Sequence, residues 1–212
     1  MQTGVFGVNT IIVPLENGKC FVVDPAATSL SNDENVIVDF LEREKLECIA
    51  VILTHSHFDH ITGIYKIIEK FPSAKIVCHE DEFLELQNPP AKNGEAVIRY
   101  FGVLELIPEV QKQPSAQIAL KDNQNLGFID ETLKSWICIH TPGHTPGSMC
   151  LYSKKDNVLI SGDTLFDYGG YGRTDMPGGD EIKMQNSLSL LKKKIPSETI
   201  VYPGHDSFGF KF

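Results

Sequence analysis

The 212-residue sequence lacks several features that would assign it to a specialised class of protein. No apolar run approaches the roughly 20 residues of a membrane span, and no Lys or Arg precedes the first apolar stretch, as one would in a secretory signal. A net charge of −9 lacks the basic excess that favours nucleic acid or an anionic membrane. We therefore expect a cytoplasmic protein with neither of these partners.

The five cysteines also lack the spacing of a known cysteine site. None belongs to a CxxC pair, so neither a disulfide framework nor a cysteine zinc site is predicted. Each cysteine lies in or beside an apolar run, which is typical of buried free thiols.

Composition and patterning predict an α/β fold. With 42% apolar and 22% charged residues the chain can form a core, and its length fits a single domain over residues 1–212. Apolar runs predict strands at 9–13, 20–23, 48–53, 74–78, 135–139, 148–153, 158–161 and 199–202. Apolar stripes and caps predict helices at 32–45, 62–70 and 180–194. Two similar blocks of strands followed by helices favour two facing sheets with helices outside.

Residues 88–120 are the least regular part of the sequence, although 93–106 carry the apolar stripe of a short helix. Two interpretations stay open. The segment is either a packed excursion with ordinary core aromatics or a lid that lines a substrate pocket.

A dense group of polar side chains follows the predicted strand 48–53. His55 and His57 are two residues apart in extended chain, so their imidazoles leave on the same side. Asp59 and His60 lie where the strand gives way to a helix. Imidazole and carboxylate are the ligands that Zn²⁺, Mn²⁺ and Fe²⁺ prefer, so this spacing predicts a metal site.

Three further candidates lie at the ends of later strands. His144 stands between Pro-Gly pairs, Asp163 follows 158–161, and His205 follows 199–202 after another Pro-Gly. Proline and glycine hold a loop backbone at a defined angle, as ligand positions require.

The series HxHxDH, PGHTPGS, GDT and PGH resembles the motif series of the metallo-β-lactamase superfamily, in order and over essentially the whole chain. The resemblance implies a four-layer αβ/βα sandwich with two metal ions at one edge. It implies His55, His57 and His144 as ligands of the first ion and Asp59, His60 and His205 as ligands of the second, with Asp163 bridging both.

Within that superfamily the chain looks closest to short glyoxalase II-like hydrolases, because residues 162–166 (GDTLF) and 172–180 (GRTDMPGGD) are similar to patterns of that group. The resemblance implies a thioesterase of the hydroxyacylglutathione hydrolase type acting on a small-molecule thioester. Two divalent ions, zinc before iron or manganese, would hold a bridging hydroxide, with Asp59 and Asp163 as the catalytic carboxylates.

Some features depart from this group. Full-length glyoxalase II enzymes add a helical domain that holds glutathione, whereas only residues 206–212 follow His205, so we expect another thiol or another way of binding glutathione. Residues 59–63 (DHITG) and 205–206 resemble persulfide dioxygenases more, which would hold one iron through His55, His144 and Asp163. A lactonase of the same fold is a further alternative. Class B β-lactamases resemble the chain less, since they lack this bridging aspartate.

Four more residues are candidates for supporting roles. His79 and His140 end predicted strands on the same edge and are expected to be structural or to contact ligands. Arg173 and Asp175 lie in the glycine-rich segment, where a guanidinium could fork onto a carboxylate and orient it, or could form a surface salt bridge instead. The sequence predicts no oligomeric state.

Overall fold

The computed structural model describes residues 1–90 and 92–212, and its framework is a pair of five-stranded sheets. The first sheet has the order β3-β4-β5-β6-β7, in which β3 is antiparallel to β4 and the other neighbours are parallel. Its strands are β3 (Ile11–Pro14), β4 (Lys19–Val23), β5 (Glu47–Ile52), β6 (Lys75–His79) and β7 (Ile118–Leu120).

The second sheet has the order β12-β11-β10-β9-β8, and only β10 and β11 are parallel within it. Its strands are β8 (Trp136–His140), β9 (Met149–Ser153), β10 (Val158–Gly162), β11 (Ile200–Pro203) and β12 (Phe210–Lys211). A small hairpin, β1 (Gln2–Thr3) with β2 (Val8–Asn9), precedes both sheets.

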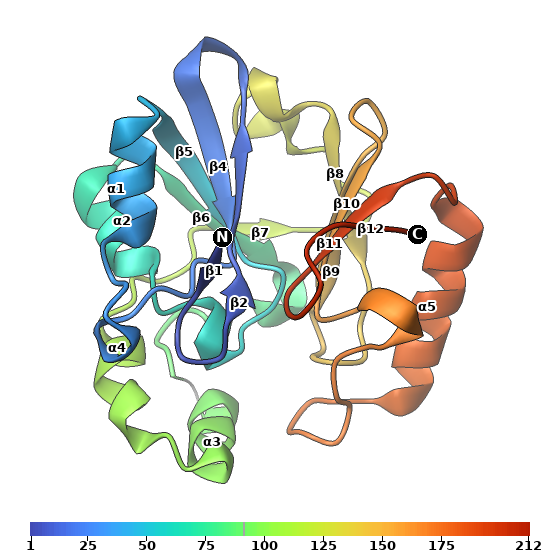
Figure 1. Ribbon diagram of the computed structural model, residues 1–212. Helices are drawn as coiled ribbons and strands as arrows, with labels where there is room; N and C mark the ends of the chain where they lie inside the picture. The colour runs from blue at the N-terminus through green and yellow to red at the C-terminus, as the bar shows by residue number, and fades with distance from the viewer. Residues whose placement is uncertain (91) are drawn as a thin grey trace.

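Helices cover the outer faces of the two sheets (Figure 1). Helices α1 (Val36–Arg43) and α2 (Ile64–Lys70) pack outside the first sheet, and α5 (Glu181–Lys194) packs outside the second. Helices α3 (Lys92–Phe101) and α4 (Ile107–Gln111) lie at one end, below the first sheet in this view. The Asp180 carboxylate caps α5 by accepting from the Lys183 amide, which satisfies one free N–H of its first turn.

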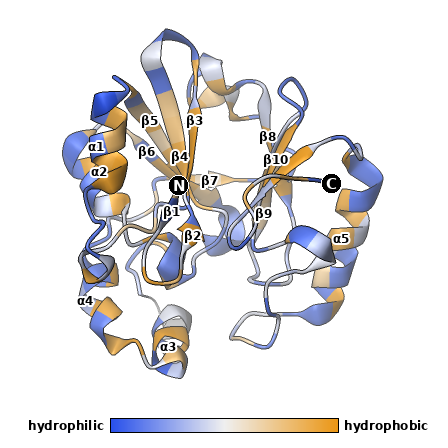
Figure 2. Ribbon diagram, in the orientation of Figure 1, coloured by the Kyte–Doolittle hydropathy of each residue, from blue (hydrophilic) through white to orange (hydrophobic). Residues whose placement is uncertain are grey.

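Three apolar layers hold the four structural layers together. Val22, Val51 and Ile76 face α1 and α2, whereas their strand neighbours face the second sheet. Between the sheets, Phe21 packs edge-on against Trp136 at 5.2 Å between ring centres. Leu159 and its neighbours form the third layer under α5. Figure 2 shows this alternation as mostly hydrophobic strands beneath helices with hydrophilic outer sides. The predicted αβ/βα sandwich is confirmed.

The structure confirms most of the predicted strands and helices to within one or two residues, and two of them differ more. The strand expected at 9–13 is interrupted at Thr10, whose amide donates locally to the Val8 carbonyl instead of to a neighbouring strand. The helix expected at 32–45 begins later, at Val36, because the Asp33 carboxylate accepts from the Gly4 and Thr28 amides and holds a loop.

Residues 88–120 are more regular than their sequence indicates. They contain α3, a 3₁₀ turn at Leu104–Leu106, α4 and the edge strand β7, in the part of the segment that the structure describes. All five cysteines are buried and free, as predicted. Among the helices of the described residues, none has the length and apolar character to cross a membrane.

Candidate metal centre

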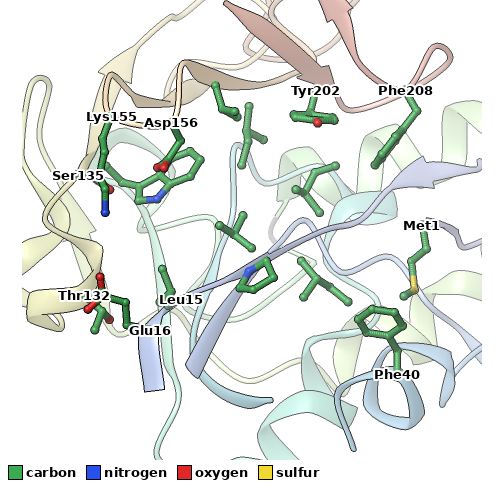
Figure 3. Close-up of a pocket in the computed structure, with 17 residues that line it drawn as sticks. Met1, Leu15, Glu16, Phe40, Thr132, Ser135, Lys155, Asp156, Tyr202 and Phe208 are labelled. Carbon is green, nitrogen blue, oxygen red and sulfur yellow. The ribbon is translucent and has the colours of Figure 1, made fainter. Parts of the chain in front are cut away.

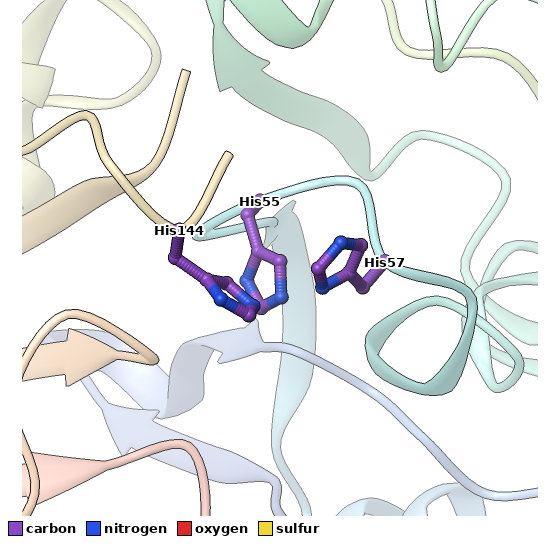
Figure 4. Close-up of side chains that lie close together, drawn as sticks. All are labelled: His55, His57 and His144. Carbon is purple, nitrogen blue, oxygen red and sulfur yellow. The ribbon is translucent and has the colours of Figure 1, made fainter. Parts of the chain in front are cut away.

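Seven side chains predicted from the sequence meet at one end of the sandwich. Three of them, His55, His57 and His144, offer ligand atoms that lie within 4.8 Å of one another (Figure 4). His55 and His57 come from the loop after β5, and His144 comes from the turn between β8 and β9. Loops at the ends of strands in two different sheets thus build the first half of the site.

The second half contains Asp59, His60 and His205, which also lie within 4.8 Å of one another. Asp59 and His60 belong to a 3₁₀ turn at Phe58–His60, and His205 follows β11. His60 Nε2 lies 3.2 Å from His205 Nε2, so both imidazoles point at the same space.

Asp163 lies between the two halves. Its Oδ2 is 3.4 Å from His144 Nε2 in the first group and 3.6 Å from His205 Nε2 in the second. Its Oδ1 is 3.6 Å from His60 Nε2. The carboxylate is therefore placed to contact ions in both halves.

Several of these polar atoms are buried without a partner in the described part of the chain. His55 Nε2, His144 Nε2 and Asp163 Oδ1 accept and donate no hydrogen bond. Buried polar atoms are satisfied in folded proteins with few exceptions, and unpaired ones that converge on a shared point suit the binding of a cation there. The residues present thus fit divalent metal ions.

Outer partners orient the imidazoles. The Arg173 carbonyl accepts from His144 Nδ1 at 2.7 Å, and Thr54 Oγ1 lies 3.0 Å from His55 Nδ1. His60 Nδ1 lies 3.0 Å from the carboxylate of the buried Asp24. Because each Nδ1 is engaged, each Nε2 is left free to bind a metal, as in other sites with outer-shell partners.

Asp24 was not predicted from the sequence. Its Oδ1 accepts from the Thr54 amide at 2.8 Å and its Oδ2 from the Thr54 hydroxyl at 2.6 Å, so it fixes the start of the His55–His60 loop as well as His60. The signal that could have found it is its place directly after β4, the strand beside β5.

Two glycines allow the loops to approach the site. A Cβ at Gly172 would lie 2.7 Å from His144 Nδ1, and one at Gly204 would meet the Asp163 carboxylate and lie 3.0 Å from His60 Cε1. Side chains at these positions would displace the ligands, so glycine is needed here for the loop backbone to lie close to them.

A model of the metallo-beta-lactamase superfamily matches residues 3–205. The chain belongs to that superfamily. A probable metallo-hydrolase of Methanocaldococcus jannaschii is 35% identical over 90% of this chain and 84% of its own length. A hydroxyacylglutathione hydrolase of Francisella tularensis subsp. novicida is 26% identical over 90% of this chain but only 60% of its own length. The solved structure of the BLEG-1 B3 metallo-beta-lactamase is similar with a TM-score of 0.81 and 29% identity, over 98% of this chain and 90% of its own. By their names, these three similar proteins are hydrolases, and two of them are named as metal-dependent ones.

The charged groups of the site shift one another's pKa values. Burial and the neighbouring imidazoles hold the pKa of His55 and His57 well below the usual value. Burial opposes a charge on His60, yet Asp163, Asp59 and Asp24 together raise its pKa to about 10. Burial also opposes a charge on Asp59, yet His60 and His205 hold its pKa below the usual range. Metal ions would replace the proton on His60, since ligands must be deprotonated to bind.

A cleft of about 340 Å³ opens over the site and is lined by His57, Asp59, Asp163 and His205. Helix α3 contributes Val97 and Phe101 to its wall. Helix α3 also packs Val97 and Ile98 into the buried core, so it has features of both interpretations of residues 88–120, and the function of a lid stays a prediction. A second hollow of about 610 Å³, lined by Trp136, Tyr202 and Phe208 among others, follows β3 and contains none of the seven side chains (Figure 3).

The four supporting candidates lie around the site rather than in it. Arg173 forks onto Asp175, with Nε and Nη2 2.6 and 2.7 Å from its oxygens, so its guanidinium orients no carboxylate of the cluster. Its backbone carbonyl, described above, is what contacts His144. His79 and His140 stack on each other with centres 3.9 Å apart, and His140 Nε2 donates to the Pro146 carbonyl in the His144 loop.

Glu82 is a further supporting residue that sequence reasoning missed. It is almost fully buried, and its Oε1 accepts from the Gly147 amide at 2.7 Å, which holds the His144 loop against β6 and the turn after it. The surrounding sequence, with four acidic residues among 80–85, gives no signal that one of them is buried.

We expect Asp24→Asn to weaken metal binding by about 10–100-fold. The amide that replaces Oδ2 cannot accept from both His60 and the Thr54 hydroxyl, whereas Asn tolerates the positive φ of 49° at this position. Competition with a chelator measures the affinity, and Asp33→Asn, at a half-buried loop carboxylate away from the cluster, serves as the control. Unchanged affinity would show that Asp24 does not orient His60.

We expect Asp163→Ala to lose metal and activity together, by more than the roughly 10–100-fold expected of an outer partner. His79→Ala should keep most of both, because His79 lies outside the cluster. Metal content per folded chain and turnover are measured on the same preparations, with circular dichroism to verify the fold. Near-normal metal content and turnover in Asp163→Ala would refute the bridging assignment.

Proposed function

We propose that the chain is a thioesterase of the hydroxyacylglutathione hydrolase type, with two divalent ions held by the seven clustered residues. The observation that carries the proposal is the position of Asp163 between two three-residue groups, within 3.4–3.6 Å of imidazoles from both. A site for a single ion on His55, His144 and Asp163 would leave the other four clustered side chains without a metal to bind.

The ligand set favours zinc, since imidazole and carboxylate are common zinc ligands, and it also accepts iron or manganese. When bound, such a pair of ions supplies a water of lowered pKa, near 7, and positive charge for a developing oxyanion. The chain's part is to hold the ions at the floor of an open cleft.

Asp59 and Asp163 are the carboxylates that we assign to the reaction. They lie at the floor of the cleft beside His57 and His205, so a bound acyl carbonyl would lie within reach of the activated water. Two divalent cations outweigh these two negative charges, so the floor stays positive, which suits the oxyanion formed by attack on a carbonyl.

The leaving group requires little help from the protein. A thiolate has a pKa of about 8.5 and departs without a strong general acid. Asp206 also lines the cleft, but we assign it no role in proton transfer. Thioesters therefore fit this site better than amides, whose nitrogen must be protonated to leave.

The resemblance to a hydroxyacylglutathione hydrolase supports thioesters, and the resemblance to BLEG-1 supports β-lactams as a second substrate class. Both reactions begin with attack of an activated water on an acyl carbon. Two further activities compete with these: that of a lactonase, and that of a persulfide dioxygenase with one iron on His55, His144 and Asp163.

The deciding experiment is hydrolysis of S-lactoylglutathione without oxygen, by zinc-loaded and iron-loaded protein. Nitrocefin is assayed beside it as a β-lactam, and an oxygen electrode follows oxygen uptake with glutathione persulfide. We expect thioester hydrolysis in the absence of oxygen and no oxygen uptake above background. No thioester turnover in either metal form, together with rapid oxygen uptake by the iron form, would overturn the proposal in favour of the dioxygenase.

A further inference from the structure

An aromatic wall lines one side of the cleft, built from three separate parts of the chain. Phe6 comes from the turn between β1 and β2, Phe58 from the loop that carries the histidines, and Phe101 from the end of α3. Phe6 packs edge-on against Phe58 at 5.5 Å and against Phe101 at 5.7 Å between ring centres. Mutual packing of this kind fixes the rings in place before a ligand binds.

The wall is only partly covered by protein. Phe6 is 36% exposed and Phe101 is 42% exposed, although both are large apolar side chains beside a site that must bind a ligand. Exposed apolar surface beside a pocket often marks a binding site, because a bound ligand covers that surface and removes water from it. Phe166 and Met176 extend the apolar lining on other sides of the cleft.

Among the described residues that line the cleft, Arg173 is the one cationic side chain besides the histidines. Its charge is already paired with that of Asp175. Besides its fork onto Asp175, its Nη2 donates to the Tyr100 hydroxyl at 3.3 Å. Its guanidinium carbon lies 5.1 Å from the centre of the Tyr100 ring and 5.7 Å from that of Phe101. The side chain thus packs against the aromatic wall while it also lines the cleft, and Asp175 neutralises its charge.

We propose that this wall binds an uncharged, apolar group of the substrate next to the scissile bond. A carboxylate in that position would find apolar rings and a guanidinium whose charge Asp175 already balances, so it would lose more in hydration than it gains in attraction. The volume of about 340 Å³ fits one compact group, such as a phenylacetyl or a branched aliphatic acyl group. The inference rests on the proposed thioesterase function and names the substrate class within it.

The apolar group could belong to the acyl part or to the thiol part of the thioester. Four thioesters separate the two sources: lactoyl or phenylacetyl as the acyl group, each on glutathione or on the uncharged thiol N-acetylcysteamine. We expect kcat/KM for phenylacetyl-N-acetylcysteamine to exceed that for S-lactoylglutathione by at least about tenfold. The two mixed thioesters show which part of the substrate carries the gain.

Three variants test the wall itself. Phe101→Ala is expected to lower kcat/KM for the thioester with the apolar group by about tenfold and to change that for S-lactoylglutathione by less than about twofold. Phe208→Ala, at an exposed ring beside the second hollow, is the matched control and should change neither. Asp175→Asn frees the Arg173 guanidinium, so we expect it to lower KM for the glutathione thioesters and not for the uncharged ones.

Binding is measured separately from turnover, so that failure of the inference differs from failure of the proposed function. Metal-loaded protein is titrated calorimetrically with S-benzyl-N-acetylcysteamine and with S-carboxymethylglutathione, two thioethers that cannot be hydrolysed. Tighter binding of the benzyl thioether, lost in Phe101→Ala, supports the wall even if no thioester is cleaved. Equal or tighter binding of the charged thioether, or a Phe101→Ala variant with unchanged preference, overturns the inference even if thioesters are cleaved.

Discussion

The constraint on which the structure depends is the gathering of five imidazoles and two carboxylates around one small space, where His55, His60, His144 and Asp163 are buried and the other three are half-buried. Without cations, such a cluster leaves polar atoms such as His55 Nε2 and Asp163 Oδ1 unpaired, and it forces His60 to hold a proton with a pKa of about 10. Unpaired buried groups are costly, so the fold must supply free energy from elsewhere to keep them together. The three apolar layers of the sandwich provide that free energy. Binding of metal ions would give the unpaired atoms partners and so remove the energetic cost of their burial.

The supporting contacts hold the loops that carry the ligands as well as the ligands themselves. Asp24 ties the start of the His55–His60 loop to the neighbouring strand, and Glu82 ties the His144 loop to the turn after β6. The segment around Arg173 links the metal centre to the cleft, since its carbonyl orients His144 while its side chain supports the wall at Phe101. A change in the wall is thereby connected to a metal ligand through a single residue.

The sequence predicted the sandwich and all seven clustered residues, because ligand spacing and strand ends are local patterns that reflect the site directly. It did not predict Asp24 or Glu82, and for Arg173 it left open whether the guanidinium orients a carboxylate of the site or forms a surface salt bridge. Each of these contacts depends on residues that are distant in the sequence, or on which of several neighbouring acidic residues faces the site. Glu82 and Asp24 are only 1–2% exposed, but burial of a single acidic residue cannot be read from the local composition. The role of α3 was undecided for the same reason, since an apolar stripe fits a core helix and a cleft wall equally well.

The most direct test of the two-ion site is the metal content of protein purified without added metal and then saturated with zinc, measured by mass spectrometry against protein concentration. Two ions per chain, falling to one or none when Asp163 is replaced, is the result that the arrangement of the two groups predicts. Saturation at a single ion per chain, with Asp59 and His205 replaceable without loss of metal, would contradict it.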